Sequence, residues 1–242
     1  KPQVIWKNIE ADLETPVSAL IKLSKNKKYS FLLESVEGGI TRGRYSAIGV
    51  NPDLIWKCKD GKSELYDSEI DSNKLISKSD DPLSALKNLI NSTKIDLPDD
   101  LPPLSAGLFG YLGYDMIKYF EEVDLNENDP LKLPESILIR PSLICIFDRL
   151  NDEFKLVTPI WPKEGVSSSQ AWSEAQNRLD IAIKELNEGL THSNLPLKTN
   201  TFSEFQADTN FKTDEYYKIV DKAKNFILEG DIYQVVLSQR FK

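Results

Sequence analysis

The chain has little of what several common functional sites require. Its 242 residues include two cysteines, one histidine and one methionine. A single histidine excludes a histidine-rich metal site, and His192 lies in a polar stretch that predicts a loop. No run approaches the roughly 18 apolar residues of a membrane span, and the N-terminus lacks the basic and then apolar pattern of a signal peptide.

The chain also has no excess of positively charged residues. The chain has 30 lysines and arginines against 38 aspartates and glutamates, which makes the net charge −8. Nucleic acids and anionic membrane surfaces are bound through basic patches, so this balance disfavours both as partners. Apolar residues make up 40% of the chain, enough to form a folded core.

The two cysteines are far apart and show no metal-binding spacing. Cys58 ends the apolar run 54–58, and Cys145 lies within the apolar run 143–147. Two reduced, buried thiols in a cytoplasmic protein are therefore expected, and a disulfide is the alternative.

The first 160 residues are mostly strand-like, with short helices between. Asp60-Gly61 is a strong tight-turn signal between two strands, and Pro82 begins a short helix that extends to Ile90. A bend at Pro141 is expected in the most apolar strand. The expected strands are 29–34, 45–50, 54–58, 63–66, 137–147 and 154–158.

Two amphipathic helices follow. The first, over 167–190, ends at Gly189 and has an inward face of Trp172, Ala175, Leu179, Ala182, Ile183 and Leu186. The second begins with Thr213 as N-cap and ends at Gly230, and an apolar strand over 232–237 is expected after it. The polar stretch between the helices predicts three parts: a domain over 1–190, a linker over 191–212 and the start of a second domain over 213–242.

Glu34 stands at the end of an apolar strand, where an unpaired carboxylate is costly. One interpretation is a partner from outside the chain, such as the ammonium group of an amino acid, with Ser35 beside it. The other is a structural pair with Arg42 or Arg44. The residues alone favour the structural pair.

The glycine-rich run 107–113 lacks the spacing and the Lys-Ser/Thr ending of a phosphate-binding loop. Large aromatic residues alternate through it, which predicts a strand whose glycines allow close backbone approach. The acidic clusters at 80–81, 99–100 and 121–122 share no spacing and predict solvated loops rather than a metal site.

Four blocks together resemble the N-terminal half of anthranilate synthase component I, a chorismate-utilising enzyme. They occur in that family's order: Phe31-Leu-Leu-Glu-Ser-Val-Glu-Gly-Gly39 with Gly43-Arg-Tyr-Ser46, Gly107–Asp115 with Tyr119-Phe-Glu121, Arg140-Pro-Ser142 with Phe147-Asp148, and Gly230–Lys242. The resemblance implies an α+β fold: a largely antiparallel β domain with a few helices, then the first helix and strand of a β/α/α/β-sandwich chorismate-binding domain.

The resemblance implies the conversion of chorismate and glutamine-derived ammonia to anthranilate and pyruvate. It also implies Mg²⁺ as cofactor and a glutamine amidotransferase subunit as partner. In the family the magnesium-binding glutamates lie in the second half, so none is expected here. The apolar run at the C-terminus suggests a chain cut within a domain, so an inactive fragment that self-associates through exposed sheet edges is expected.

The resemblance also implies site residues. The Leu33-Glu34-Ser35 motif corresponds to the family's allosteric tryptophan pocket, with Arg44 as a further basic candidate. Gln234 stands where water-using relatives have a lysine, and a neutral amide suits ammonia as nucleophile. Without the family, Gln234 is an ordinary sheet residue.

Three other functions remain open. An aminodeoxychorismate synthase fragment would share the tryptophan pocket, and its distinguishing residues would lie beyond Lys242. A stand-alone amino-acid-binding regulatory domain would need only the Glu34 site. A structural or interaction module would bind no tryptophan at all.

Overall fold

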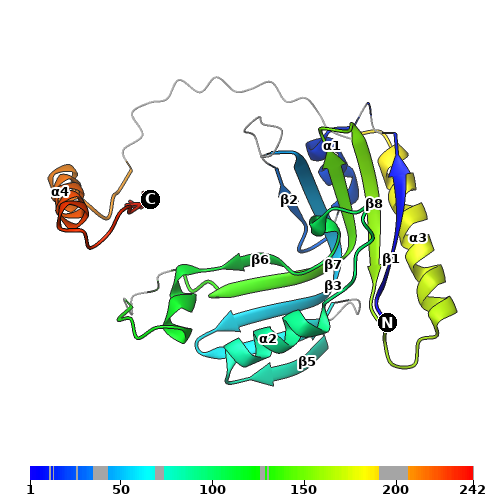
Figure 1. Cartoon of the computed structure of the whole chain (residues 1–242), viewed down its shortest axis with the longest axis horizontal. Helices are drawn as coiled ribbons and strands as arrows, with labels where there is room; N and C mark the ends of the chain where they lie inside the picture. Colours follow the sequence, from blue (N-terminus) through cyan, green and yellow to red (C-terminus); the bar gives the residue numbers. More distant parts are fainter. Residues whose placement is uncertain are drawn as a thin grey trace. The chain divides into compact units, whose positions relative to one another are not determined.

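The computed structural model describes residues 1–10, 12, 14–25, 27–34, 43–68, 74–125, 129, 131–190 and 207–241 (Figure 1). The chain divides into two compact units, Lys1–Thr191 and His192–Lys242, and each is described by itself.

The first unit is built on one antiparallel sheet of eight strands. In sheet order, β1 is followed by β8, β7, β3, β4 and β5, while β2 pairs with β3 and β6 pairs with β7. The strands are β1 (Gln3–Ile9), β2 (Phe31–Leu33), β3 (Tyr45–Lys59), β4 (Lys62–Asp67), β5 (Lys74–Ser79), β6 (Phe109–Leu112), β7 (Ser136–Asp148) and β8 (Glu153–Ile160). The coarse expectation of a largely antiparallel β unit with a few helices is confirmed for this unit.

The two longest strands, β3 and β7, pair along most of their length and curl the sheet. Figure 1 shows both turning from the lower part of the sheet into its upright part. Their register shifts between Pro52 and Leu54, where Pro52 stands opposite Pro141. Neither proline has an N–H to donate, so the ladder is interrupted where the strands bend. The bend expected at Pro141 is confirmed, and the strands expected separately over 45–50 and 54–58 are one strand.

A buried ion pair lies at this bend. Arg140 donates from Nε and Nη2 to the two carboxylate oxygens of Asp53, at 2.7 and 2.6 Å. Both side chains are less than a tenth exposed, and the guanidinium lies 4.2 Å from the centre of the Trp161 ring. The two prolines interrupt the ladder, and the ion pair joins the two strands across that interruption.

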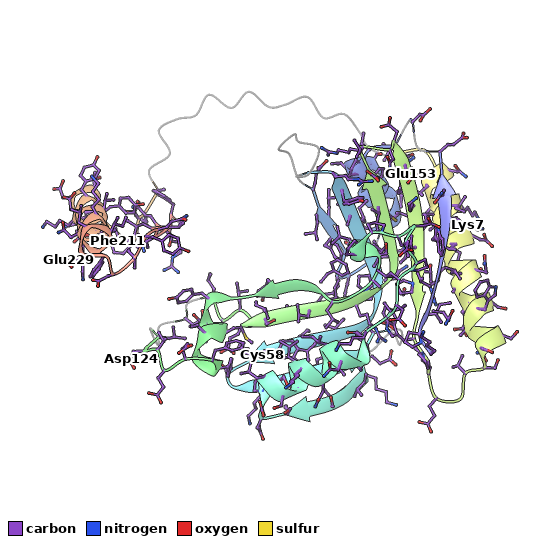
Figure 2. The ribbon with its side chains drawn as sticks, viewed as in Figure 1. Lys7, Cys58, Asp124, Glu153, Phe211 and Glu229 are labelled. Atoms are coloured by element: carbon purple, nitrogen blue, oxygen red, sulfur yellow. The ribbon has the colours of Figure 1, made fainter. Side chains whose placement is uncertain are left out.

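Two helices cover one face of the upright part of the sheet. Alternate residues of β7 face them, so Leu143, Cys145 and Phe147 pack with the helices while Ile144 and Ile146 belong to the opposite face. The helices are α1 (Pro16–Leu23) and α3 (Ser168–Asn187). Lys22 of α1 donates to the carbonyl oxygen of Leu186 in α3 at 2.7 Å, and Lys7 of β1, labelled in Figure 2, pairs with Asp180 of α3.

The expected inward face of α3 is confirmed for five residues and wrong for one. Ala175, Leu179, Ala182 and Leu186 are buried and Ile183 packs, partly buried, against the same core, while Trp172 is 51% exposed. The face that contacts the core begins at Ala175, one turn after the indole. Gly189 is not the cap, because the helix is capped by Glu188 in an extended conformation.

The opposite face of the sheet packs against irregular chain. Leu101 and Phe109 are buried there with Ile55 and Ile144. The segment that follows α2 (Pro82–Ser92) includes the short 3-10 helices η1 (Pro103–Ser105) and η2 (Tyr114–Tyr119), with β6 between them. The helix expected from Pro82 is confirmed.

Local signals for close turns and close packing are also confirmed. The β3–β4 turn places Asp60 and Gly61 at φ values of 50° and 78°, the left-handed region that such a hairpin needs. The glycine-rich run forms β6, and a Cβ added to Gly110 would lie 1.9 Å from the carbonyl oxygen of Ile137. The glycine therefore lets the two backbones meet, as expected of a strand rather than a phosphate loop.

Both cysteines are buried and unpaired, as expected. Figure 2 places Cys58 inside the lower part of the unit, and burial raises the pKa of its thiol to about 11. Burial also raises the pKa of Cys145. Both groups are therefore protonated at neutral pH, which makes them structural side chains rather than nucleophiles.

The second unit is formed by α4 (Thr213–Glu229) and the segment around it. Gly230 ends the helix in the left-handed region at φ 84°, as expected, but the N-cap is Lys212 rather than Thr213. No residue of α4 is buried, so its expected inward face meets no core among the described residues. In the described part of the chain, no helix is both long enough and apolar enough to cross a bilayer.

The expected strand over 232–237 is wrong for this structure. These residues have no regular secondary structure, and among the described residues of this unit the one strand-like pairing is an isolated bridge between Thr209 and Phe241. Tyr233 and Val236 are 94% and 83% exposed. Strand-forming residues need a neighbouring strand for their backbone groups, and the described residues provide none at this place.

Candidate functional site

Three of the residues nominated from the sequence lie at one end of the upright sheet. At this end β2 finishes, β3 begins and β7 turns into β8. Leu33 pairs with Ala47 of β3, and Tyr45, next to Arg44, pairs with Asp148 of β7. The backbone N–H of Arg149 also donates to the carbonyl oxygen of Arg44 at 3.0 Å. Chain segments about a hundred residues apart therefore converge on Glu34 and Arg44.

Among the described residues Glu34 is paired with Arg149, and not with Arg44, one of the two arginines that the sequence suggested. Its Oε1 accepts from Nη2 of Arg149 at 2.5 Å, and the side chains of the two residues are 30% and 46% exposed. Arg44 binds another carboxylate, and Arg42 lies outside the described residues. Sequence reasoning missed Arg149 because the register of β3 on β7, which brings it to Glu34, has no local signal in the sequence.

Arg44 is held by Asp148. It donates from Nε and Nη2 to the two oxygens of that carboxylate, at 2.8 and 2.6 Å. Asp148 also accepts from the backbone N–H of Leu150 and from Nδ2 of Asn151. These bonds, that of Arg44 above all, lower the pKa of Asp148 although burial opposes the shift. Removing Arg44 from this carboxylate would leave an almost buried charge without its cation.

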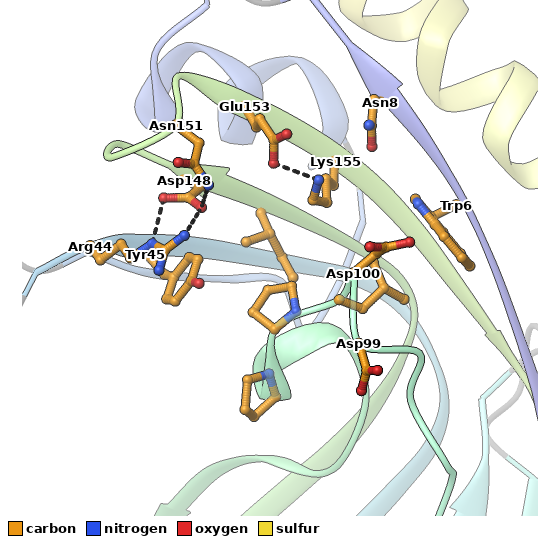
Figure 3. Close-up of a pocket in the computed structure, with 14 residues that line it drawn as sticks. Trp6, Asn8, Arg44, Tyr45, Asp99, Asp100, Asp148, Asn151, Glu153 and Lys155 are labelled. Carbon is orange, nitrogen blue, oxygen red and sulfur yellow. Dashed lines mark hydrogen bonds and ion pairs between the residues drawn. The ribbon is translucent and has the colours of Figure 1, made fainter. Parts of the chain in front are cut away.

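A cavity of about 680 Å³ lies on the face of the sheet opposite α1 and α3. Figure 3 shows Arg44 and Tyr45 on one side of it and Trp6 and Asn8, from β1, on the other. Its two cations are engaged, Arg44 by Asp148 and Lys155 by Glu153 at 2.6 Å. Both cations among the described lining residues therefore have a counterion.

A second hollow, of about 460 Å³, lies on the α1 side of the same sheet end. Phe147 and Phe154 line it, and their rings stack with centroids 4.2 Å apart. Arg149 is the one cation among the described residues that line it. Five carboxylates line it as well: Asp12, Glu14, Asp148, Asp152 and Glu153, the last of which Figure 2 labels.

The structure says less about the other nominated residues. Ser35 falls outside the described residues. Gln234 belongs to the second unit, is exposed and is not in a strand. Leu33 is 49% exposed at the end of β2. The structure thus brings Glu34 and Arg44 together with Asp148 and Arg149, while Gln234 belongs to the second unit, which is described by itself.

Comparison with protein families gives one match that covers most of the chain. The sequence model of the family described as chorismate binding enzyme matches residues 30–242.

Curated relatives agree with this match. The chain is 39% identical over 244 residues to anthranilate synthase component 1 of Cereibacter sphaeroides, which covers 99% of the chain and 48% of that protein. It is 32% identical over 239 residues to the same component of Aquifex aeolicus, covering 98% of the chain and 47% of that protein. The chain therefore spans about half the length of the curated relatives it matches.

A solved structure shows the same fold. The crystal structure of anthranilate synthase component I from Streptococcus pneumoniae matches 97% of the chain and 48% of its own length, with a TM-score of 0.55 and 23% sequence identity. At that identity the likeness concerns the fold alone, including the curled antiparallel sheet.

Proposed function

The chain belongs to the family of chorismate binding enzymes, and we propose that it is the N-terminal part of an anthranilate synthase component I. The observation that carries this proposal is the 39% identity over 99% of the chain to a curated protein of that name. The reaction proposed for the whole protein joins ammonia to chorismate and releases pyruvate to give anthranilate, the first committed step of tryptophan biosynthesis.

Within that protein, the contribution proposed for this part is the tryptophan feedback site. Leu33, Glu34, Ser35 and Arg44 form it. Two features of the described residues support this. The Glu34 carboxylate is charge-paired yet partly exposed, so an ammonium group can reach it. The hollow beside its partner Arg149 has the volume of a small-molecule site and two aromatic walls. A tryptophan molecule that binds here and favours an inactive arrangement of the enzyme would make the site allosteric.

The catalytic groups and the ammonia supply are proposed for the whole protein. Gln234 would help to orient ammonia, which a glutamine amidotransferase subunit would supply. Mg²⁺ would stabilise negative charge on chorismate. The described residues contain no group of three or more His, Cys, Asp or Glu side chains positioned for a metal ion, so no step through magnesium is assigned to them.

The proposed organisation follows the sequence. Residues 1–190 are the tryptophan-sensing domain, 191–212 a linker, and 213–242 the start of the chorismate-binding domain. Two buried, unpaired thiols suit a reducing, cytoplasmic location.

The test is a calorimetric titration of the 242-residue chain with L-tryptophan. We expect micromolar binding, and a rise in Kd of at least about tenfold in Glu34→Gln, because a charge-assisted hydrogen bond to the ammonium group becomes a neutral one. Glu121→Gln, an equal charge change at an exposed residue of another region, serves as the matched control. A folded chain that does not bind tryptophan contradicts the proposed site.

The same preparation tests the assignment of the catalytic apparatus. With chorismate, Mg²⁺ and ammonia, we expect no anthranilate fluorescence from these 242 residues, since the proposed metal ligands are not among them. Turnover would show that this part of the protein holds a complete active site.

A further inference from the structure

Two consecutive residues at the β7–β8 turn contact the two charged side chains of the proposed site. Asp148, the last residue of β7, binds the guanidinium of Arg44 through both of its carboxylate oxygens. Arg149, the next residue, donates to Glu34 at 2.5 Å, and its backbone N–H donates to the carbonyl oxygen of Arg44 at 3.0 Å. The turn therefore joins the end of β2 to the residue before β3, and its geometry affects where Glu34 and Arg44 lie.

The carboxylate of Asp148 fixes the geometry of this turn. Its Oδ1 accepts hydrogen bonds from Nε of Arg44 and from the backbone N–H of Leu150. Its Oδ2 accepts from Nη2 of Arg44 and from Nδ2 of Asn151, and Figure 3 shows Asp148 between these two side chains. The four bonds match the roughly four lone-pair positions of a carboxylate, and the side chain is only 6% exposed. A ligand that bound Asp148 would have to displace one of them.

Asparagine cannot replace this carboxylate, although the two side chains have nearly the same shape. One of the two oxygens becomes an NH2 group, which donates hydrogen bonds and accepts none. Since each oxygen of Asp148 accepts two bonds, two of the four are lost, and the guanidinium of Arg44 loses its counterion. Asp148→Asn therefore loosens both Arg44 and the turn that presents Arg149 to Glu34.

A second ion pair of the same unit has the same chemistry at another place. Arg140 donates to both carboxylate oxygens of Asp53 at the bend of the sheet. The Arg140 side chain is 8% exposed, against 31% for Arg44. Loss of the Asp53 charge should therefore destabilise the fold at least as much as loss of the Asp148 charge. A comparison of the two aspartates separates an effect on the position of Glu34 from an effect on stability.

We propose that Asp148 is a positioning residue of the tryptophan site: it holds Arg44 and the β7–β8 turn in place, and through the turn it fixes Glu34. The inference rests on the proposed tryptophan site, and it gives Arg44 the function of holding the site together rather than of binding the ligand. The site is then ordered before the ligand arrives, so that binding does not bear the cost of ordering its side chains.

The test measures tryptophan binding and local order in the same variants. Calorimetric titrations with L-tryptophan use the full 242-residue chain, Asp148→Asn, Arg44→Gln and the double variant of these two. Asp53→Asn is the matched control, because it makes the same chemical change in the other ion pair. Hydrogen exchange at the Arg149 amide, measured by NMR without ligand, reports on the turn itself. Thermal unfolding by circular dichroism gives a temperature at which every variant is folded.

We expect Asp148→Asn to weaken tryptophan binding by roughly 5- to 100-fold, because the ligand must then order side chains that the turn no longer holds. The double variant should lie within about twofold of the weaker single variant, since the two residues act as one unit. Asp53→Asn should lower the unfolding temperature and leave the Kd within about twofold. Exchange at the Arg149 amide should rise more in Asp148→Asn than in Asp53→Asn.

Two results would overturn the inference while leaving the tryptophan site in place. In one, Asp148→Asn and Asp53→Asn change the Kd by the same factor, or neither changes it, so that Asp148 matters no more than any structural residue. In the other, the effects of Asp148→Asn and Arg44→Gln multiply in the double variant, as they would if Arg44 contacted the ligand by itself. If a folded wild-type chain does not bind tryptophan, the proposed site and the role of Asp148 in it fall together, whereas the exchange rates still show whether Asp148 holds the turn.

Discussion

The buried Asp53–Arg140 pair should be one of the most sensitive points of the first unit. Each side chain is less than a tenth exposed, and the two are joined by two hydrogen bonds. Asp53→Ala would leave the Arg140 guanidinium buried without a counterion, a change that costs roughly 3–5 kcal/mol. That is a large share of the roughly 5–15 kcal/mol by which a domain is stable.

Urea unfolding followed by tryptophan fluorescence measures this cost. All four tryptophans, at 6, 56, 161 and 172, belong to the first unit, so the signal reports on that unit alone. With a slope of about 2 kcal/mol per molar urea, the predicted loss lowers the midpoint by roughly 1.5–2.5 M. Arg140→Met should cost a similar amount, since it leaves Asp53 buried and unpaired and removes the cation above Trp161.

The double variant Asp53→Ala/Arg140→Met distinguishes a coupled pair from two independent residues. Replacing both charges by apolar side chains leaves no unpaired ion, so its cost should fall at least about 2 kcal/mol short of the sum of the single changes. The exposed pair Lys62–Asp80, at 3.7 Å, is the control. Single costs that add within about 0.5 kcal/mol would refute the argument that the ion pair holds the bend of the sheet.

Two further predictions concern pH and association. Arg44 lowers the pKa of Asp148, so this carboxylate stabilises the fold above its unfolded pKa of about 3.9, and the contribution is lost as pH falls through the folded value. Asp148→Asn should therefore be destabilised at pH 7, and its difference from wild type should shrink below about pH 4 in urea titrations; a constant difference would contradict this. The outer edge of β5, where Ile76 is 52% exposed, should promote self-association, and sedimentation showing only monomer at high concentration would argue against it.

The elements that the sequence predicted well depend on neighbouring residues. Asp60-Gly61 specifies a tight hairpin through two left-handed backbone positions. Pro82 begins a helix and Gly230 ends one. In each case a few residues decide the local geometry wherever the rest of the chain lies.

The predictions that were wrong depend instead on contacts with other parts of the structure. The strand expected over 232–237 has suitable residues but no partner strand, and Trp172 lies on the apolar side of α3 but before the part that packs on the core. A periodic pattern predicts which residues could be buried. Whether they are buried depends on what packs against them.

In the candidate site, too, the sequence predicted single residues, whereas the tertiary structure determined their contacts. By itself the sequence identified a carboxylate at a strand end, Glu34, and a basic residue near it, Arg44, and its motifs pointed to the family. The tertiary structure decided their partners, since Arg149 and Asp148 lie 115 and 104 residues away along the chain. Strand register is set by the burial of whole strands such as β3 and β7. Only the folded sheet could therefore determine which charges meet.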